Sequence, residues 1–337
     1  NSAFGYKALR YNTTGPNNTA IGGNALQNNT FGGYNTALGR ATLFSNTTGI
    51  QNVAIGALTL YNNTIGRFNV AVGAYSLYSN STGEKNSAFG SYALYNNTTS
   101  NNSAFGYKAL LSNTTGTRNI AIGVGALQAN TIGSSNTAVG HNSLISNTTG
   151  DNNSAFGRYS LRYNITGQSN SAFGSNALRL NTIGINNSAF GFYALRNNTT
   201  GIQNTAVGYA ALQNNTVGVN NTAIGYGSLF SNTTGDSNVA IGWNSLASNT
   251  TAKRSTAVGT STLKNNTTGF ANSAFGYYAL NVNTTGSANT AVGYMASRLN
   301  TVGDHNSSFG YFALYNNTVS NNSAFGYKTL RFNTTGG

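Results

Sequence analysis

Apolar and polar residues follow a pattern along this chain that returns every 17 residues. Residues 1–5 read Asn-Ser-Ala-Phe-Gly, residues 18–22 read Asn-Thr-Ala-Ile-Gly, and residues 35–39 read Asn-Thr-Ala-Leu-Gly. The glycine of this segment occurs 20 times, from Gly5 to Gly326, and two of the steps between copies are 16 residues long. Self-similarity at a fixed short period is the signature of a repeat architecture, and each copy is called a rung below.

The rung separates exposed positions from the rest. Numbered from its first residue, position 1 is Asn in 19 of the 20 rungs, position 3 is Ala in 19, position 9 is Leu in 19 and position 12 is Asn in all 20. Position 4 is always Phe, Ile, Val or Leu, while all 21 charged residues fall at positions 6, 7, 10, 16 or 17. We predict that these five positions face solvent, because charged side chains are almost never fully buried unless they are paired.

The period and the local chemistry both indicate β-structure. Seventeen residues are too few for a paired-helix repeat, which needs about 33, and suit one turn of a β-solenoid. Positions 2 and 4 carry strand-forming residues, and Gly at positions 5 and 15 and Asn at positions 1 and 12 suit corners. We predict an all-β, parallel β-solenoid (a β-roll) of about 20 rungs, spaced about 4.8 Å apart. Each rung should hold a strand at positions 1–5, a second at about 7–10 and a short third segment at 12–14.

Side chains alternate along a strand, so positions 2 and 4 should point to one face and position 3 to the other. We expect the large residue at position 4 and the Leu at position 9 to form the core. The Ala at position 3 would then lie outside and pack closely against another surface, and a second chain would help to bury the thin core. The Asn residues at positions 1 and 12 should stack as amide ladders that satisfy backbone groups in the turns.

The repeat runs from one end of the chain to the other. We therefore predict one continuous array over residues 1–337, and we expect it to be a segment of a longer fibre. The longest apolar run is a few residues, which predicts no membrane span in this segment. The chain contains no cysteine, so a disulfide scaffold is excluded.

Composition argues against most enzyme chemistry. Only 6% of the residues are charged, and the chain has four Asp plus Glu, two His and no Cys. Acid–base catalysis and metal sites need several such groups close together, and a glycosidase needs a pair of carboxylates. His141 and His305 occupy solvent positions, and no nucleophile or third partner completes a triad with them. We predict a protein that is not an enzyme and that binds no metal and no cofactor.

The strand motif takes its most distinctive form at residues 52–56, 119–123 and 238–242, which read Asn-Val-Ala-Ile-Gly or Asn-Ile-Ala-Ile-Gly. It resembles the head repeat of the trimeric autotransporter adhesins, the YadA-like head, and the resemblance extends over all 20 copies. The resemblance implies a left-handed β-roll, a homotrimer and a location outside the cell or at its surface. That family's repeat is shorter and lacks the Leu-x-x-Asn-Thr-Thr-Gly stretch. Similar repeats also occur in phage and viral tail-fibre-like proteins.

Two sets of surface residues recur from rung to rung and are candidate binding ladders. Arg162, Arg179 and Arg196 share position 10 of successive rungs, and the net charge is +13. Such a basic stripe would attract an anionic polymer, for example an acidic polysaccharide or a cell surface, or it is a solvated edge that discourages sideways aggregation. We expect no nucleic-acid partner. The second set shares position 6 and consists of Tyr277, Tyr294, Tyr311 and Tyr327. Rows of rings can bind sugars, and stacking between rungs explains them without a ligand.

Asn-x-Thr sequons recur at position 12, and in a secreted protein they would be glycan acceptors. An Asn ladder beside a Thr ladder creates the same sequons without any glycan, so both explanations stay open. The candidate acceptors are Asn12, Asn46, Asn113, Asn147, Asn232, Asn283 and Asn333.

The sequence therefore predicts an extracellular structural fibre or adhesin shaft, without enzyme activity. It should self-associate, as a homotrimer or fibre, and present repeated ladders for multivalent contact with surfaces or glycans. A phage or viral tail-fibre segment is one alternative. An ice-binding solenoid that uses the Asn and Thr ladders at positions 12 and 14 is another, which is weakened because seven rungs carry Phe, Ile or Val at position 14.

Overall fold

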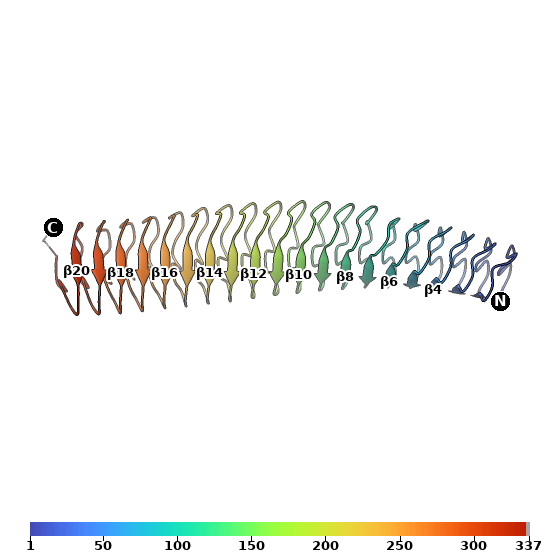
Figure 1. Ribbon diagram of the computed structural model, residues 1–337, viewed down its shortest axis with the longest axis horizontal. Coiled ribbons are helices and arrows are strands. Elements are labelled where there is room, and N and C mark those ends of the chain that lie inside the picture. Colours follow the sequence, from blue (N-terminus) through green and yellow to red (C-terminus); the bar gives the residue numbers. More distant parts are fainter. Residues whose placement is uncertain (335–337) are drawn as a thin grey trace. The chain divides into compact units, whose positions relative to one another are not determined.

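The computed structural model describes residues 1–334 as an all-β chain of 20 strands, with no helix in that range (Figure 1). The chain forms two compact units, Asn1–Ser169 and Asn170–Gly337. Residues 335–337, the last three of the predicted array, lie outside the described part. The N-terminal unit holds β1 (Ser2–Phe4), β2 (Thr19–Ile21), β3 (Thr36–Leu38), β4 (Val53–Ile55), β5 (Val70–Val72), β6 (Ser87–Phe89), β7 (Ser103–Phe105), β8 (Ile120–Ile122), β9 (Thr137–Val139) and β10 (Ser154–Phe156). The C-terminal unit holds β11 (Ser171–Phe173), β12 (Ser188–Phe190), β13 (Thr205–Val207), β14 (Thr222–Ile224), β15 (Val239–Ile241), β16 (Thr256–Val258), β17 (Ser273–Phe275), β18 (Thr290–Val292), β19 (Ser307–Phe309) and β20 (Ser323–Phe325).

Within each unit, strands that are neighbours in sequence pair in parallel. Ala20 of β2 lies opposite Ala3 and Ala37 of the flanking strands. Ala189 of β12 lies opposite residues at the same rung position in β11 and β13. Equivalent rung positions therefore stack directly, and the arrows of each unit in Figure 1 run side by side in one direction. This confirms the predicted parallel β-solenoid with its repeat of about 17 residues.

The prediction of a second strand at positions 7–10 is wrong. The short third segment at positions 12–14 forms no strand within residues 1–334, although it bonds to the next rung, as the Thr47 N–H does to the Thr64 carbonyl at 2.9 Å. Positions 6–11 form consecutive turns, because the residues at positions 7 and 9 have a left-handed backbone. In one such turn Lys108 has φ 57° and Leu110 has φ 51°. The rungs stay linked even so, since the Leu110 N–H donates to the Ala126 carbonyl of the next rung at 3.0 Å. Lys and Leu rarely adopt positive φ, so the sequence carried no clear signal for this turn.

The core assignment of positions 3 and 4 is also wrong, because the two faces of the strand are exchanged. Ala189 at position 3 and Leu195 at position 9 are fully buried, whereas Phe190 at position 4 is 41% exposed. The interior contains the Ala of position 3, the small residue of position 8 and the Leu of position 9. Position 1 shares a face with position 3, and Asn187 at position 1 is buried. An inward amide at position 1 therefore requires an inward Ala at position 3.

Close stacking of the rungs requires glycine at position 5. Gly56 has φ 129°, and a Cβ at this residue would lie 2.8 Å from the carbonyl carbon of Gly73 in the next rung. The 16-residue rungs are shortened in a different turn, near position 15, where they carry Ser100 and Ser320 in place of Gly. In the first of them the Thr99 carbonyl accepts the side-chain amides of Asn86 at 2.8 Å and Asn97 at 2.7 Å. The shorter turn thus keeps the interior amide contacts.

The charged side chains lie on the outside of the solenoid. All 21 are half-buried or exposed, as expected for positions 6, 7, 10, 16 and 17. The interior is therefore built from neutral groups alone. Among residues 1–334, no helix has the length and apolarity that crossing a membrane requires.

Candidate interaction surfaces

The repeated Asn residues form two amide ladders inside each unit, as predicted. At position 12, the Asn46 Nδ2 donates to Asn29 Oδ1 at 2.7 Å and to the Gly49 carbonyl at 3.0 Å. At position 1, the Asn35 Nδ2 donates to the same Gly49 carbonyl at 2.8 Å, and the Asn35 Oδ1 accepts the backbone N–H of Asn52 at 3.0 Å. The two ladders meet on the carbonyl of position 15, so they close each rung and also tie it to its neighbours.

The ladder at position 12 contains the candidate glycan acceptors, with their Nδ2 atoms turned inward. Asn12 and Asn333 are half-buried, and their Nδ2 atoms donate within the fold. Thr335, the last residue of the Asn333 sequon, lies outside the described residues. The other five are fully buried, and each Nδ2 donates to the preceding ladder Asn and to a backbone carbonyl: Asn46, Asn113, Asn147, Asn232 and Asn283. Because a glycan is attached through Nδ2, this geometry favours the explanation in which stacked Asn and Thr create the sequons without glycans.

The same geometry bears on the ice-binding hypothesis. The Asn ladder at position 12 is internal, so it presents nothing to ice. The neighbouring Thr ladder at position 13 is used between rungs, as the Thr47 hydroxyl donates to the Thr64 carbonyl at 3.1 Å. Position 14 is exposed, yet it carries apolar residues such as Ile65 and Ile132 among its threonines. The surface therefore lacks the regular Asn and Thr array that the hypothesis requires.

The four tyrosines at position 6 stack face to face in the C-terminal unit. Ring centroids are 5.3 Å apart between Tyr277 and Tyr294, 5.2 Å between Tyr294 and Tyr311, and 5.3 Å between Tyr311 and Tyr327. Burial raises the pKa of the Tyr277 hydroxyl, and its hydrogen bond with Tyr278 raises that pKa further. The four tyrosines of the stack remain 40–69% exposed. Binding of a ligand by this ladder stays a prediction.

Arg162 and Arg196 of the position-10 ladder lie against aromatic rings. In the N-terminal unit, the Arg162 guanidinium carbon is 4.5 Å from the ring centroid of Tyr159. In the C-terminal unit, the Arg196 guanidinium carbon is 4.8 Å from the ring centroid of Tyr193, and Arg179 occupies the preceding rung. All three arginines are half-buried. Cation–π contacts of this kind contribute about 0.5–1 kcal/mol at exposed sites, so they order the guanidinium groups and leave them partly open to solvent.

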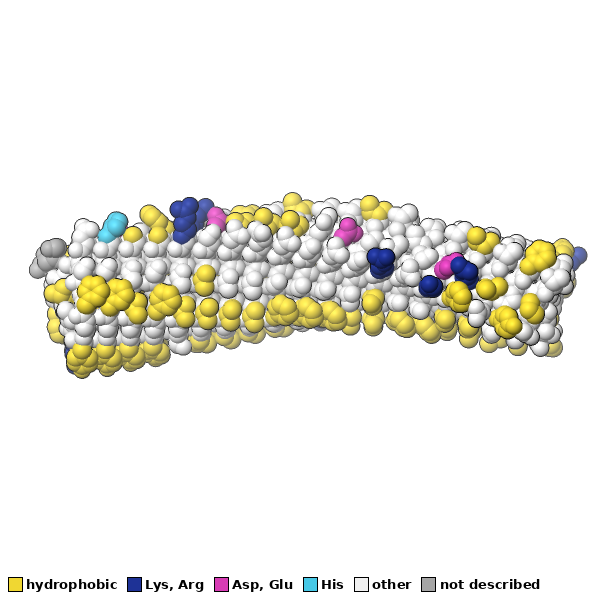
Figure 2. Space-filling view, viewed as in Figure 1, with side chains coloured by type: hydrophobic (Ala, Val, Ile, Leu, Met, Phe, Trp, Pro, Cys, Tyr) yellow, Lys and Arg dark blue, Asp and Glu magenta, His cyan; other side chains and the backbone are white. Residues whose placement is uncertain are grey.

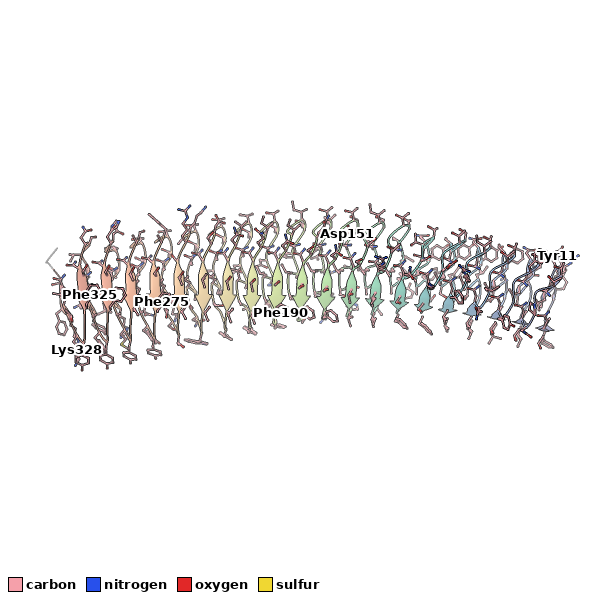
Figure 3. All side chains as sticks on the ribbon, in the orientation of Figure 1. Tyr11, Asp151, Phe190, Phe275, Phe325 and Lys328 are labelled. Carbon is pink, nitrogen blue, oxygen red and sulfur yellow. The ribbon has the colours of Figure 1, made fainter. Side chains whose placement is uncertain are left out.

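An apolar row, called the position-4 ridge below, runs along the outer face of the strands. Figure 2 shows hydrophobic side chains gathered in such a row, and Figure 3 labels Phe190, Phe275 and Phe325, which belong to it. Rings of the ridge stack on one another, as Phe309 and Phe325 do with centroids 5.0 Å apart. In the N-terminal unit the ridge consists of Phe4, Ile21, Leu38, Ile55, Val72, Phe89, Phe105, Ile122, Val139 and Phe156. In the C-terminal unit it consists of Phe173, Phe190, Val207, Ile224, Ile241, Val258, Phe275, Val292, Phe309 and Phe325.

A cluster of tyrosines in the N-terminal unit joins the row Tyr61, Tyr78 and Tyr95 at position 10, which the sequence shows as a ladder that could bind sugars, to a second row at position 7 that the sequence analysis did not connect with it. Tyr75 stacks on Tyr92 at position 7, and Tyr78 stacks on Tyr95 at position 10, both with centroids 5.1 Å apart. The planes of Tyr92 and Tyr95 are tilted by 52° at 5.7 Å, so the two stacks touch. The available signal was a pair of Tyr residues three positions apart in two successive rungs. Residues three apart on a strand point to opposite faces, and positions 7–10 were predicted to be a strand.

The acidic residues at position 16 bond to the backbone and to nearby cations. The Asp151 Oδ1 accepts a backbone N–H of the preceding rung at 2.7 Å. Glu84 pairs with Arg67 at 2.8 Å, and Asp236 pairs with Lys253 at 2.7 Å. Both histidines are exposed. Within residues 1–334, no three His, Cys, Asp or Glu side chains gather as metal ligands would.

Comparison with known proteins adds no assignment to these surfaces. No protein-family model matches this chain, and no curated protein matches it. The candidate interaction surfaces are therefore the position-4 ridge, the aromatic stacks and the charged residues beside them.

Proposed function

We propose that this chain is part of an extracellular structural fibre or adhesin shaft, without catalytic activity, that assembles with copies of itself. In this proposal it presents repeated surface ladders for multivalent contact with surfaces or glycans. The observation that carries the proposal is the position-4 ridge, an apolar side chain on every rung at the outer face of the strands. An exposed apolar row of this kind marks an interaction surface, because its burial removes apolar area from water.

The resemblance to the heads of trimeric autotransporter adhesins supports a left-handed β-roll assembled as a homotrimer at the cell surface. Three copies related by a closed rotation would bury the same ridge from each chain. A phage or viral tail-fibre segment is the alternative, and it would use the ridge in the same way.

The interior is suited to a shaft rather than to a catalyst. Each Asn ladder bonds one rung to the next, so mechanical continuity does not depend on any single residue. Surface groups recur at one rung position, and many weak contacts of one kind can add through avidity. Contact with a surface or glycan should therefore grow with the number of rungs.

Sedimentation velocity of the full chain tests the proposed assembly. We expect a species several times heavier than the 35.0 kDa chain. Phe190, Phe275 and Phe309 are three ridge residues of the C-terminal unit. Replacing them by Thr should release monomers, because Thr suits a strand and removes most of the apolar surface at each of these three positions.

The matched control is the same replacement at three exposed apolar residues of position 14 in the same unit. These are Ile183, Val217 and Val302, and rungs with Thr at that position already exist. The control should keep the mass of the wild type. A wild type that sediments as a monomer, or a ridge variant that keeps the assembled mass, would refute self-association through the ridge.

A further inference from the structure

The N-terminal unit has a depression of about 430 Å³ at the point where its two tyrosine stacks end. Ligand sites commonly have volumes of roughly 300–1,000 Å³. None of the repeated ladders of the proposed fibre depends on this place. Two successive rungs line the depression, with Tyr92, Tyr95 and Asn96 from one and Tyr107, Lys108 and Leu111 from the next.

Aromatic rings form its walls. Tyr107 stands edge-on to Tyr92, with ring centroids 6.3 Å apart and planes at 87°. Tyr95 is tilted by 52° relative to Tyr92 at a centroid distance of 5.7 Å. Tyr75 supports Tyr92 from behind and Tyr78 supports Tyr95, each by a stack at 5.1 Å. The walls are therefore held in place before any ligand arrives.

The stacks end here because the next rung has no ring at either position. Position 7 changes from Tyr92 to Lys108, and position 10 changes from Tyr95 to Leu111. One face of Tyr92 therefore has no stacked ring upon it. Tyr294, inside the stack at position 6, has a ring on both faces. An aromatic face without a stacked ring can pack against the apolar face of a ligand.

Polar groups complete the lining. The Asn96 side chain has no hydrogen-bond partner among residues 1–334. The Lys108 Nζ lies 5.0 Å from the centroid of the Tyr107 ring, and none of the six lining residues is acidic. Burial raises the pKa of Tyr78, and the neighbouring tyrosine hydroxyls raise it further. The six lining residues thus offer an amide, three tyrosine hydroxyls and one positive charge.

We propose that this depression binds an acidic pyranose, a sugar ring that bears a carboxylate, within a polysaccharide chain. The C–H groups on one face of a pyranose would pack on the face of Tyr92 that carries no stacked ring, as an apolar surface packs on an aromatic ring. The sugar hydroxyls would bond to the Asn96 carboxamide, and the carboxylate to the Lys108 ammonium. This inference rests on the proposed function, contact with glycans, and adds to it the class of sugar and one defined binding site.

Single-stranded nucleic acid is the competing ligand, because its bases also stack on aromatic side chains. Binding of that kind needs a positively charged groove that follows the phosphate backbone. Lys108 is the one cation among the six residues that line the depression. One cation suits a single carboxylate better than a row of phosphates, so the sugar is favoured.

The test is calorimetric titration of the full chain with three probes: hexagalacturonate, its neutral methyl-esterified form and hexathymidylate. The main variant is Tyr92→Asn. Asn already occupies position 7 in other rungs with positive φ, as at Asn142, so the turn should fold. The matched control is Tyr34→Asn, since Tyr34 is an exposed tyrosine with φ 59°, against 60° for Tyr92, and lies outside the depression. A third variant, Lys108→Asn, removes the charge.

We expect hexagalacturonate to saturate one site on each wild-type chain and to bind at least tenfold more weakly to Tyr92→Asn. Lys108→Asn should bind it several-fold more weakly and lose the preference over the neutral ester, while Tyr34→Asn should match the wild type. The proposal is overturned if Tyr92→Asn binds like the wild type, if the neutral ester binds equally well, or if hexathymidylate binds more tightly.

A substitute variant covers a folding failure, and sedimentation separates the test of the sugar site from the test of the fibre. If Tyr92→Asn does not fold, Tyr107→Ser replaces it, because Ser91 already occupies the same position in the preceding rung. Sedimentation reports assembly independently of the titration. A chain that binds hexagalacturonate but stays monomeric would refute the fibre and support the sugar site. A chain that assembles but binds none of the probes would support the fibre and refute the sugar site.

Discussion

Two aspartate substitutions within β12 distinguish the inward from the outward face of the strands. Ala189→Asp should open the rungs around it, whereas Phe190→Asp should destabilise them less. Ala189 is fully buried and lies in register between Ala172 and Ala206. Phe190, the next residue, is on the ridge and is 41% exposed.

The structure sets the size of each effect. A carboxylate at Ala189 would be buried without a partner, since every charged side chain lies outside the core, and such burial costs several kcal/mol. Extra atoms between closely stacked Ala residues add about 1–3 kcal/mol of strain. Phe190→Asp loses somewhat over half of the roughly 1.5–3 kcal/mol that full burial of Phe contributes. It also loses the stack with Phe173 at 5.0 Å, worth about 0.5–1.5 kcal/mol. The two variants should therefore differ by roughly 2 kcal/mol or more.

Hydrogen exchange measured by mass spectrometry is the appropriate assay, because a repeat protein can open locally rather than all at once. The reporting amides are those of Ser188, which donates to the Asn204 carbonyl at 2.8 Å, and Thr205, which donates to the Asn221 carbonyl at 2.8 Å. The protein is diluted until sedimentation shows monomers, so that loss of assembly at the ridge does not contribute. If Phe190→Asp accelerates exchange as much as Ala189→Asp, the inward position of Ala189 is wrong.

Three more predictions follow from the stacking of the rungs. Gly56→Ala should lower the free energy of unfolding, measured by thermal denaturation, by about 1–3 kcal/mol, because the added Cβ would meet the next rung. The control Gly23→Ala should leave it unchanged, because no atom lies within 4 Å of the added Cβ. Asn46→Asp should lower the free energy of unfolding by about 1–3 kcal/mol for each buried hydrogen bond that the substitution breaks. Mass spectrometry of the intact wild type should give 35.0 kDa, without added sugar on the Asn ladder. The raised pKa of Tyr78 should be visible as late ionisation in an ultraviolet titration. The protonated Tyr78 hydroxyl therefore stabilises the folded state fully below the ordinary tyrosine pKa of about 10, and this stabilisation is lost as the pH rises through the folded-state pKa. Ionisation of Tyr78 at the pKa of an ordinary tyrosine would contradict the prediction.

The exchange of the two strand faces shows what pattern analysis leaves undecided. In a strand of three residues, alternation predicts that Ala189 and Phe190 point to opposite sides, but it does not say which side is the core. Size suggested that Phe is internal. The Asn ladders decide otherwise, because the amides of positions 1 and 12 both reach the carbonyl of position 15 inside the rung. With Asn on the inner face, the space left beside it fits Ala and excludes Phe.

The tyrosine cluster was hidden for a related reason. The left-handed backbone at positions 7 and 9 turns the chain so that Tyr92 and Tyr95 face each other across the turn. Leu and Lys at these positions give little local preference for such a conformation. It is imposed by the hydrogen bonds between rungs, which include the bond from Leu110 to Ala126.

The sequence by itself determined the period, the parallel stacking, the solvent-facing positions and the amide ladders. In a solenoid each residue meets copies of its own position, so every steric or electrostatic limit is repeated 20 times and becomes visible in one chain. The tertiary structure decided which strand face is internal, where the apolar ridge lies and how the turn at positions 6–11 brings Tyr92, Tyr95 and Tyr107 together. These three features depend on how the different segments of a rung pack around one interior. The residue types found at a single rung position do not predict that packing.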